Sequence, residues 1–256
     1  MQTVTKISHP QFPSDTHWDV EGVKAAGLYT WFKEISEELD NSWVVVDGKK
    51  MLMMGGYSYL GLNKNEAIEQ AAMISIGRYG TGMSGSRFLA GSTSVHAEVE
   101  RKVATLHNKD AAMLLTSGYL ANVSTISALL KKGDYVICDK LNHASIMDGA
   151  RYSEANFLRY RHNDPSHLKV ILNKIPDNAR KLVITDSVFS MCGEAADLPK
   201  IIHICKQFDA ALMVDECHSM YVLGKTGGGI VEYFNLDPKA ILRASITASH
   251  KEADLF

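Results

Sequence analysis

The chain has 256 residues, of which 46% are hydrophobic and 22% are charged. These proportions are typical of a soluble globular protein and permit one large domain or two small ones. The formal net charge of −2 provides no overall field that would favour binding to nucleic acid or to an anionic membrane.

The first 55 residues are expected to form a separate N-terminal segment. Residues 1–20 look like a polar arm rather than a signal peptide, because they carry acids, prolines and histidines in place of an apolar core. Residues 20–39 have apolar side chains at helical spacing and predict an amphipathic helix. Residues 43–46 and 50–54 are strand-like runs around an Asp-Gly turn, and they predict a β-hairpin.

Residues 56–256 are expected to form one larger domain. Helices are predicted over residues 67–79 and 95–107, and after these, strand-like and helical runs alternate. The predicted strands are residues 111–115, 135–138, 156–160, 182–185, 210–214 and 241–247, and the helices between them are residues 116–130, 145–152, 166–175 and 198–208. This α/β alternation predicts a mostly parallel sheet with helices on both faces. No apolar run is long enough to span a membrane.

The acid and histidine in Val214-Asp215-Glu216-Cys217-His218-Ser219 are the most informative pair of side chains. They stand where a buried strand meets its loop, and open α/β sheets bind ligands at the carboxyl ends of their strands. The Asp215 carboxylate could hold a cofactor nitrogen protonated, while His218 contacts a neighbouring polar atom. A protein tunes pyridoxal phosphate (PLP) in this way.

Three further polar clusters follow other predicted strands. Thr116-Ser117-Gly118-Tyr119 opens a helix, where free amides and the Ser117 hydroxyl could bind a phosphate, although a simple N-cap has the same pattern. His143 could stack on a planar cofactor or be an ordinary residue at a helix start. Residues 186–191 contain an acid and two serines, which suit either polar ligand contacts or a plain turn. All these clusters would converge on one crevice.

A glycine-rich loop over residues 79–87 ends in Arg87, which could bind a carboxylate or phosphate bidentately. The alternative is a flexible connection between two helices. The four cysteines lack CxxC spacing, so reduced thiols in a cytoplasmic protein are expected. Cys217 and His218 do not form the paired ligands of a zinc motif, and no metal site is expected.

The same stretches resemble the α-oxoamine synthases, a branch of the fold-type-I PLP enzymes. The resemblance covers residues 51–237, and the glycine-rich loop is most like that of the serine palmitoyltransferase subfamily. The matching stretches are residues 57–62, 79–91, 116–122, 139–144, 186–193 and 214–229. The implied fold is the PLP-transferase large domain, incomplete at its C-terminal end.

The resemblance also implies which residues hold the cofactor. Ser117, Gly118 and Tyr119 would form the phosphate-binding turn, and Ser190 would lie near the cofactor. The PLP itself is therefore an expectation that comes from the family as well as from the residues at the predicted sheet edge.

Three residues are expected to be catalytic by the same resemblance. His143 would stack on the pyridine ring and help to position the substrate carboxylate, Asp215 would pair with the ring nitrogen, and His218 would contact the phenolic oxygen. The implied reaction condenses an amino acid with an acyl-CoA, with decarboxylation, to give an α-aminoketone. The implied assembly is a homodimer, or a heterodimer with a related subunit.

The lysine motif of the family is altered in this chain. Thr247-Ala248-Ser249 resembles the opening of the motif, but the position of the Schiff-base lysine falls on Glu252, and Lys251 stands one place early. The C-terminal domain of the family is expected to be missing. Two alternatives therefore remain open: a non-catalytic partner or fragment of such an enzyme, and another fold-type-I enzyme such as an aminotransferase or autoinducer synthase.

Overall fold

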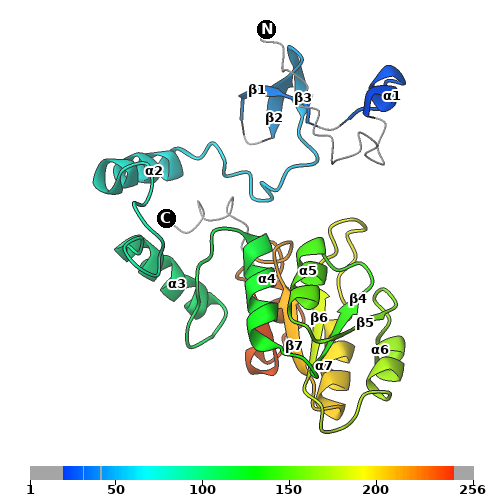
Figure 1. Cartoon of the computed structure of the whole chain (residues 1–256). Helices are drawn as coiled ribbons and strands as arrows, with labels where there is room; N and C mark the ends of the chain where they lie inside the picture. Colours follow the sequence, from blue (N-terminus) through cyan, green and yellow to red (C-terminus); the bar gives the residue numbers. More distant parts are fainter. Residues whose placement is uncertain (1–19, 31, 41, 245–256) are drawn as a thin grey trace, which may run out of the picture. The chain divides into compact units, whose positions relative to one another are not determined.

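The computed structural model describes residues 20–30, 32–40 and 42–244 (Figure 1). Contacts between residues divide the chain into two compact units, Met1–Met54 and Gly55–Phe256.

The first unit contains one short helix and a three-stranded antiparallel sheet of order β1-β2-β3. The strands β2 (Trp43–Val46) and β3 (Lys49–Leu52) pair around the Asp-Gly turn, which confirms the hairpin. The predicted helix over residues 20–39 is wrong beyond its start. Helix α1 covers only Val20–Ala25, Gly27 has a left-handed φ of 68°, and β1 (Ile35–Glu38) pairs with β2 instead.

The second unit is built on five parallel strands in the order β5-β4-β6-β7-β8. Their bounds are Tyr135–Asp139 (β4), Asn156–Tyr160 (β5), Lys181–Asp186 (β6), Ala211–Asp215 (β7) and Leu242–Ala244 (β8). The chain runs from β4 to β5 on one side and then crosses to β6 on the other. The loops that follow β4 and β6 therefore leave the sheet at its topological switch point, where ligands bind in such folds.

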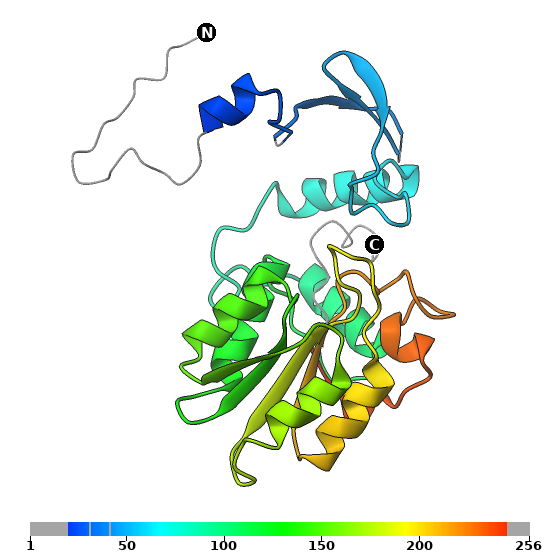
Figure 2. The same cartoon turned by 90° about the vertical axis from the view of Figure 1, so that its right-hand side faces the viewer.

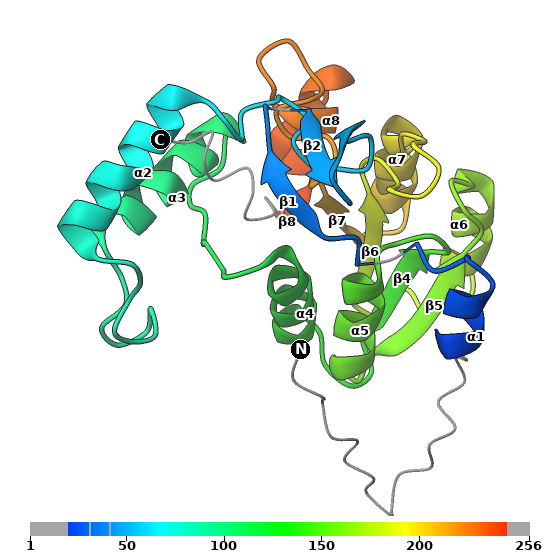
Figure 3. The ribbon, with the colours of Figure 1, turned by 90° about the horizontal axis from the view of Figure 1, so that it is seen from above.

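Helices cover both faces of this sheet (Figures 2 and 3). Side chains of β4 alternate between the two sides, because successive residues of a strand point to opposite faces. Val136 and Cys138 pack with Ile126 of α4 and Ile146 of α5. Ile137 instead joins the core on the side of α6 and α7. The predicted fold class is confirmed.

Four helices of this unit, α2, α4, α6 and α7, start at capping side chains. Asn65, Ser117, Asp164 and Asp197 each accept a hydrogen bond from a first-turn amide of the helix that follows. The bounds are Glu66–Tyr79 (α2), Ser94–Leu106 (α3), Gly118–Leu129 (α4), Ala144–Tyr152 (α5), Pro165–Leu172 (α6), Leu198–Gln207 (α7) and Gly229–Tyr233 (α8), with a 3₁₀ turn at Pro238–Ala240. Within the described ranges, no helix combines the length and apolar character that crossing a membrane requires.

The predicted strand over residues 111–115 is wrong. The amide of Leu114 donates to Oε1 of Glu100 at 2.8 Å, and its carbonyl accepts from Nη1 of Arg87 at 2.7 Å. These side chains replace the ladder partners of a strand. Nη1 of Arg87 also forms an ion pair with Oε1 of Glu100 at 2.6 Å, so this nitrogen is bound within the fold. Within the predicted strand over residues 241–247, residues 242–244 form β8. Residues 245–247 lie outside the described part.

Helices α4 and α5 pack closely at Gly149. A Cβ atom at Gly149 would lie 3.0 Å from Cδ1 of Ile126 and 3.2 Å from the carbonyl oxygen of Asn122. We expect Gly149→Val to overpack this contact and to lower the free energy of unfolding by about 1–3 kcal/mol, measured by urea denaturation. Gly77→Val is the matched control, because Gly77 of α2 has open space around it. Equal urea midpoints for the two variants would contradict the packing account.

Candidate functional site

Two buried acids end neighbouring strands of the sheet. Asp186 of β6 and Asp215 of β7 are partners in the strand register, and the amide of Ser187 donates to the Asp215 carbonyl at 2.8 Å. The two residues are 4% and 3% exposed. Two carboxyl groups with so little water around them cannot both be ionised at low cost.

The amide of Asn122 links the site across two helices and a strand. Its Nδ2 donates to Oδ2 of Asp215 and to Oγ of Ser145, at 2.9 Å in each case. The other carboxylate oxygen of Asp215 accepts from the amide of Cys217 at 3.0 Å. Oγ of Ser145 lies 2.7 Å from Nδ1 of His143. A continuous chain of polar contacts thus runs from Asp215 to His143.

His143 is the N-cap of α5 and is itself exposed. Its Nδ1 accepts from the amide of Ser145 at 3.2 Å. A ring whose Nδ1 accepts carries its proton on Nε2, so the exposed edge of His143 is a donor. The preceding residue, Asn142, is buried and donates through Nδ2 to Oδ1 of Asp186 at 2.8 Å. The loop after β4 therefore contacts both acids, directly or through Ser145 and Asn122.

The proton of the acid pair lies on Asp186. Burial, and next the neighbouring carboxylate of Asp215, raise the pKa of Asp186 to about 8. Asp186 is therefore largely neutral at pH 7. Among the described residues, no lysine, arginine or histidine forms an ion pair with Asp215. The site therefore presents a buried carboxylate that can receive a cation.

His218 lies in the turn after β7. Its Nδ1 is 2.6 Å from the phenolic oxygen of Tyr59, and the Tyr57 ring is 6.3 Å away between centroids. Burial, followed by the charges of Cys217 and Tyr57, raises the pKa of Tyr59. Tyr59 therefore keeps its proton at neutral pH and can donate to His218.

The turn that starts α4 has the geometry of a helix N-cap. Oγ of Ser117 accepts from the amide of Leu120 at 3.1 Å. The amides of Gly118 and Tyr119 belong to the first turn, where a helix provides no backbone acceptor. The Tyr119 hydroxyl donates to Asp148 at 2.6 Å. Because Asn122 lies on the same helix, one rigid element carries both this turn and the contact to Asp215.

The structure thus joins most of the residues that the sequence singled out. His143 and Asp215 are linked by hydrogen bonds, the Ser117 turn lies on the linking helix, and His218 follows Asp215 by three residues. Ser190 is exposed in the loop after β6, and within the described part of the chain it forms no hydrogen bond with the other predicted site residues.

Sequence reasoning gave no role to Asn122, Asn142 or Ser145, although they connect the site. Asn122 alone carried a signal, because it is an amide in the otherwise largely apolar stretch of α4.

The fold and this acid-lined sheet edge match a known class of proteins. Residues 49–247 match the family model described as aminotransferase class I and II. The chain belongs to this family. Its relatives place it in the α-oxoamine synthase branch, as its motifs indicated.

Curated relatives and solved structures that resemble this chain carry the same enzyme names. A serine palmitoyltransferase of Sphingobacterium spiritivorum is 42% identical over 87% of this chain and 56% of its own length. An 8-amino-7-oxononanoate synthase of Thermosipho melanesiensis is 38% identical over 85% of this chain and 56% of its own length. The structure of a serine palmitoyltransferase from S. paucimobilis with a bound PLP–myriocin aldimine aligns with a TM-score of 0.83 and 32% identity, over 86% of this chain and 56% of that one. The chain thus spans about half the length of these relatives.

The shared proton of the acid pair predicts a pH dependence of stability. An unfolded aspartate titrates near pH 4, whereas the pKa of folded Asp186 is about 8. Between these values the folded state binds more protons than the unfolded state, so this group makes the protein less stable as pH rises. We expect Asp186→Asn to gain stability relative to the wild type between pH 5 and 8, by at most about 1.4 kcal/mol per pH unit.

Urea midpoints measured across this pH range provide the check. Asp177→Asn is the control, because it makes the same chemical change at an exposed position. A stability of Asp186→Asn, taken relative to the wild type, that stays constant or falls as pH rises would contradict the raised pKa of Asp186.

Proposed function

We propose that residues 56–256 of this chain bind PLP and belong to an enzyme that condenses an amino acid with an acyl-CoA. The reaction proceeds with decarboxylation and gives an α-aminoketone. The observation that carries the proposal is the buried Asp215 carboxyl group at the switch-point edge of a parallel sheet, together with the family to which the chain belongs.

Asp215 suits the pyridine nitrogen of PLP. Its oxygens accept one bond each, from Asn122 and from the Cys217 amide, which fixes the carboxylate and leaves further lone pairs. A buried charge is costly unless it is paired. The protonated ring nitrogen is a planar cation of the right size for this role, and the neutral Asp186 beside Asp215 does not compete for it.

The other ends of the cofactor have matching groups. The amides of Gly118 and Tyr119, at the positive end of the α4 dipole, suit a phosphate, and the hydroxyl of Ser117 stands next to them. Ser190 is assigned to the same cofactor on its family position alone. The distribution of donors along α4 and the sheet edge thus fits an anionic group at one end and a cationic ring atom at the other.

Two histidines are proposed to act on the ring and the substrate. His143 offers its ring face to the pyridine and its Nε2–H to a substrate carboxylate. His218, held by Tyr59, is placed to donate to the phenolic oxygen. When bound, PLP supplies an electron sink for the carbon next to the amino nitrogen. Asp215 holds the charge that keeps this sink effective, and Asn122 keeps Asp215 in place.

The lysine that this chemistry needs has to come from residues outside the described part. Lys251 stands one place before the position that the family motif indicates, and Glu252 occupies that position. This substitution favours a second candidate function: a PLP-binding subunit that pairs with a catalytic relative. The first candidate predicts a homodimer and the second a heterodimer, both in the cytoplasm.

Three measurements on the purified chain separate these functions. Absorption spectra during a PLP titration report binding, and borohydride reduction followed by mass spectrometry reports whether Lys251 bonds to the cofactor. Release of CoA and CO₂ from mixtures of amino acids and acyl-CoAs reports the condensation. An adduct at Lys251 with product formation supports the first function, and binding without adduct or product supports the second. Absence of PLP binding would rule out both.

Asp215→Asn tests the role of the buried carboxylate. Removing its charge should weaken PLP binding by about ten- to a hundredfold, because a charge-assisted hydrogen bond is replaced by a neutral one. The affinity is measured by equilibrium titration, with circular dichroism to verify folding. Asp177→Asn, an exposed acid, is the control and should bind PLP like the wild type. Equal affinities for all three proteins would show that Asp215 does not contact the cofactor.

A further inference from the structure

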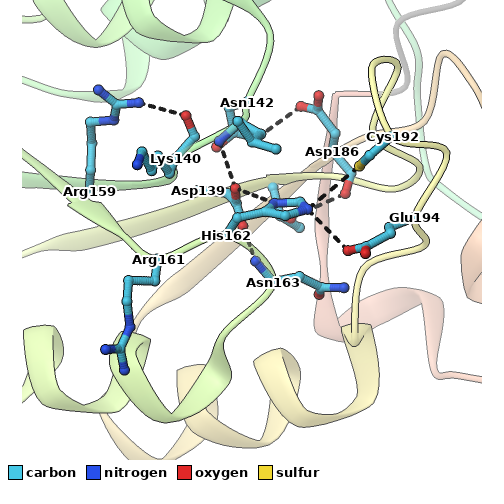
Figure 4. A network of polar contacts seen from close by, with 12 residues as sticks. Asp139, Lys140, Asn142, Arg159, Arg161, His162, Asn163, Asp186, Cys192 and Glu194 are labelled. Atoms are coloured by element: carbon cyan, nitrogen blue, oxygen red, sulfur yellow. Dashed lines mark hydrogen bonds and ion pairs between the residues drawn. The ribbon is translucent and has the colours of Figure 1, made fainter.

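Three side chains with metal-binding atoms meet outside the site described above (Figure 4). His162 follows β5, whereas Cys192 and Glu194 lie in the loop between β6 and α7. Nε2 of His162 is 3.1 Å from Oε2 of Glu194 and 3.6 Å from Sγ of Cys192, and the three ligand atoms lie within 4.8 Å of one another. We propose that His162, Cys192 and Glu194 bind a zinc ion. This proposal does not depend on the proposed function.

The second nitrogen of His162 meets a buried carboxylate. Nδ1 lies 2.9 Å from Oδ1 of Asp139, which is fully buried at the end of β4. Asp139 is held in turn by the amides of Leu141 and Asn163, at 2.8 and 2.7 Å. This carboxylate places the ring proton on Nδ1 and leaves the lone pair of Nε2 directed at the cluster. Metal-binding histidines commonly donate their other N–H to a carboxylate in this way.

His162 is also fixed by packing. Its ring stands edge-on to Phe189, with 4.4 Å between centroids and 88° between planes. The next residue, Asn163, donates to the carbonyl of Ala195 at 3.1 Å and accepts from the amide of Asp197 at 3.0 Å. The loop after β5 is therefore bonded to the loop that carries the other two ligands.

The turn that holds Cys192 and Glu194 is closed on itself. The amide of Phe189 donates to the Glu194 carbonyl at 2.9 Å, and the amide of Gly193 donates back to the Phe189 carbonyl at 2.8 Å. Gly193 has a φ of 72°, which a side chain would disfavour. This backbone turns both ligands toward His162 without a metal, so little ordering remains to be done on binding.

The spacing of the ligand atoms fits tetrahedral zinc. With Zn–S of about 2.3 Å and Zn–N or Zn–O of about 2.0–2.1 Å, tetrahedral angles give S···N of about 3.6 Å and N···O of about 3.3 Å. The observed separations are 3.6 and 3.1 Å. Two of the three separations therefore already suit zinc, and the third, between Sγ of Cys192 and the Glu194 carboxylate, is within 4.8 Å.

The donor set selects zinc over the other common divalent ions. Magnesium and calcium prefer oxygen ligands throughout, whereas a thiolate and an imidazole with one carboxylate suit zinc. Cys192 and Glu194 are exposed, so an ion can reach them from solvent, and water can occupy the fourth position. The ligands are 30 and 2 residues apart, a spacing that matches no motif, which explains why the sequence predicted no metal site.

Zinc would clamp the loop after β5 to the loop after β6. Cys192 lies two residues beyond Ser190, so an occupied site would also hold the turn that carries Ser190.

Cobalt substitution tests the site directly. The full chain, without a histidine tag, is reduced, stripped with a chelator and titrated with Co²⁺. We expect one equivalent to produce a thiolate-to-cobalt band in the near ultraviolet, and Zn²⁺ to displace it. Because the chain contains ten histidines, the thiolate band is the specific readout. Cys192→Ser should abolish this band.

Competition with a chromophoric chelator then measures zinc affinity. His162→Gln and Glu194→Gln should weaken it by at least about ten- to a hundredfold, the loss that even supporting residues of metal sites cause. Cys217→Ser and His203→Gln, which change a partly exposed thiol and an exposed imidazole elsewhere, should leave it within about twofold. Zinc should raise the Tm of the wild type and of both controls but not that of Cys192→Ser.

Two results would overturn the proposal whatever the variants do to folding. One is the absence of a thiolate band when the wild type is titrated with Co²⁺. The other is a band that persists in folded Cys192→Ser or a zinc affinity that is unchanged in folded His162→Gln.

Discussion

The structure of the candidate site depends on one buried amide. Asn122 donates both of its Nδ2 bonds inside the protein, one to Asp215 and one to Ser145, and thereby joins α4, α5 and β7 at a single point. The Asp215 carboxyl group is buried, so a hydrogen bond from Asn122 replaces one that water would provide. The same hydrogen bond fixes the rotation of α4 about its axis. Rotation of α4 in turn determines where the amides of its first turn point. One hydrogen-bonded side chain thus sets the relation between the two ends of the site.

The acid pair shows how strand register controls charge. Asp186 and Asp215 are paired residues at the ends of adjacent strands. Paired residues of neighbouring strands point to the same face of the sheet, so the two carboxyl groups are neighbours. Burial and mutual repulsion leave one proton on the pair, and Asn142 and Asn122 provide separate donors for the two members. The result is an acid pair in which Asp186 favours its neutral form. A single isolated aspartate at this edge would lack such a partner, and its ionisation would depend on its own burial alone.

Much of this arrangement could be predicted from the sequence, and the failures have physical causes. Asp215 ends an apolar strand and His143 follows another after a short loop, and these positions identify the ligand edge of a parallel sheet. Ser117 was recognisable from its N-cap pattern, although the apolar run before it is not a strand. Asn122, Asn142 and Ser145 were missed because their partners depend on strand order, which local patterns do not encode. The apolar spacing in residues 20–39 fits a helix, but Ile35–Glu38 instead forms a strand that pairs with the edge of β2. The run at residues 111–115 is too short to separate a strand from an extended segment bonded to Arg87 and Glu100.

The order of the strands along the chain also determines when the site can be completed. Because β7 is made after β4, β5 and β6, a growing chain displays the Asn122 helix and the Asp186 loop before their common partner has left the ribosome. Synthesis from the amino end therefore makes the α4 helix and the Asp186 loop first and adds the Asp215 carboxyl group to the site last.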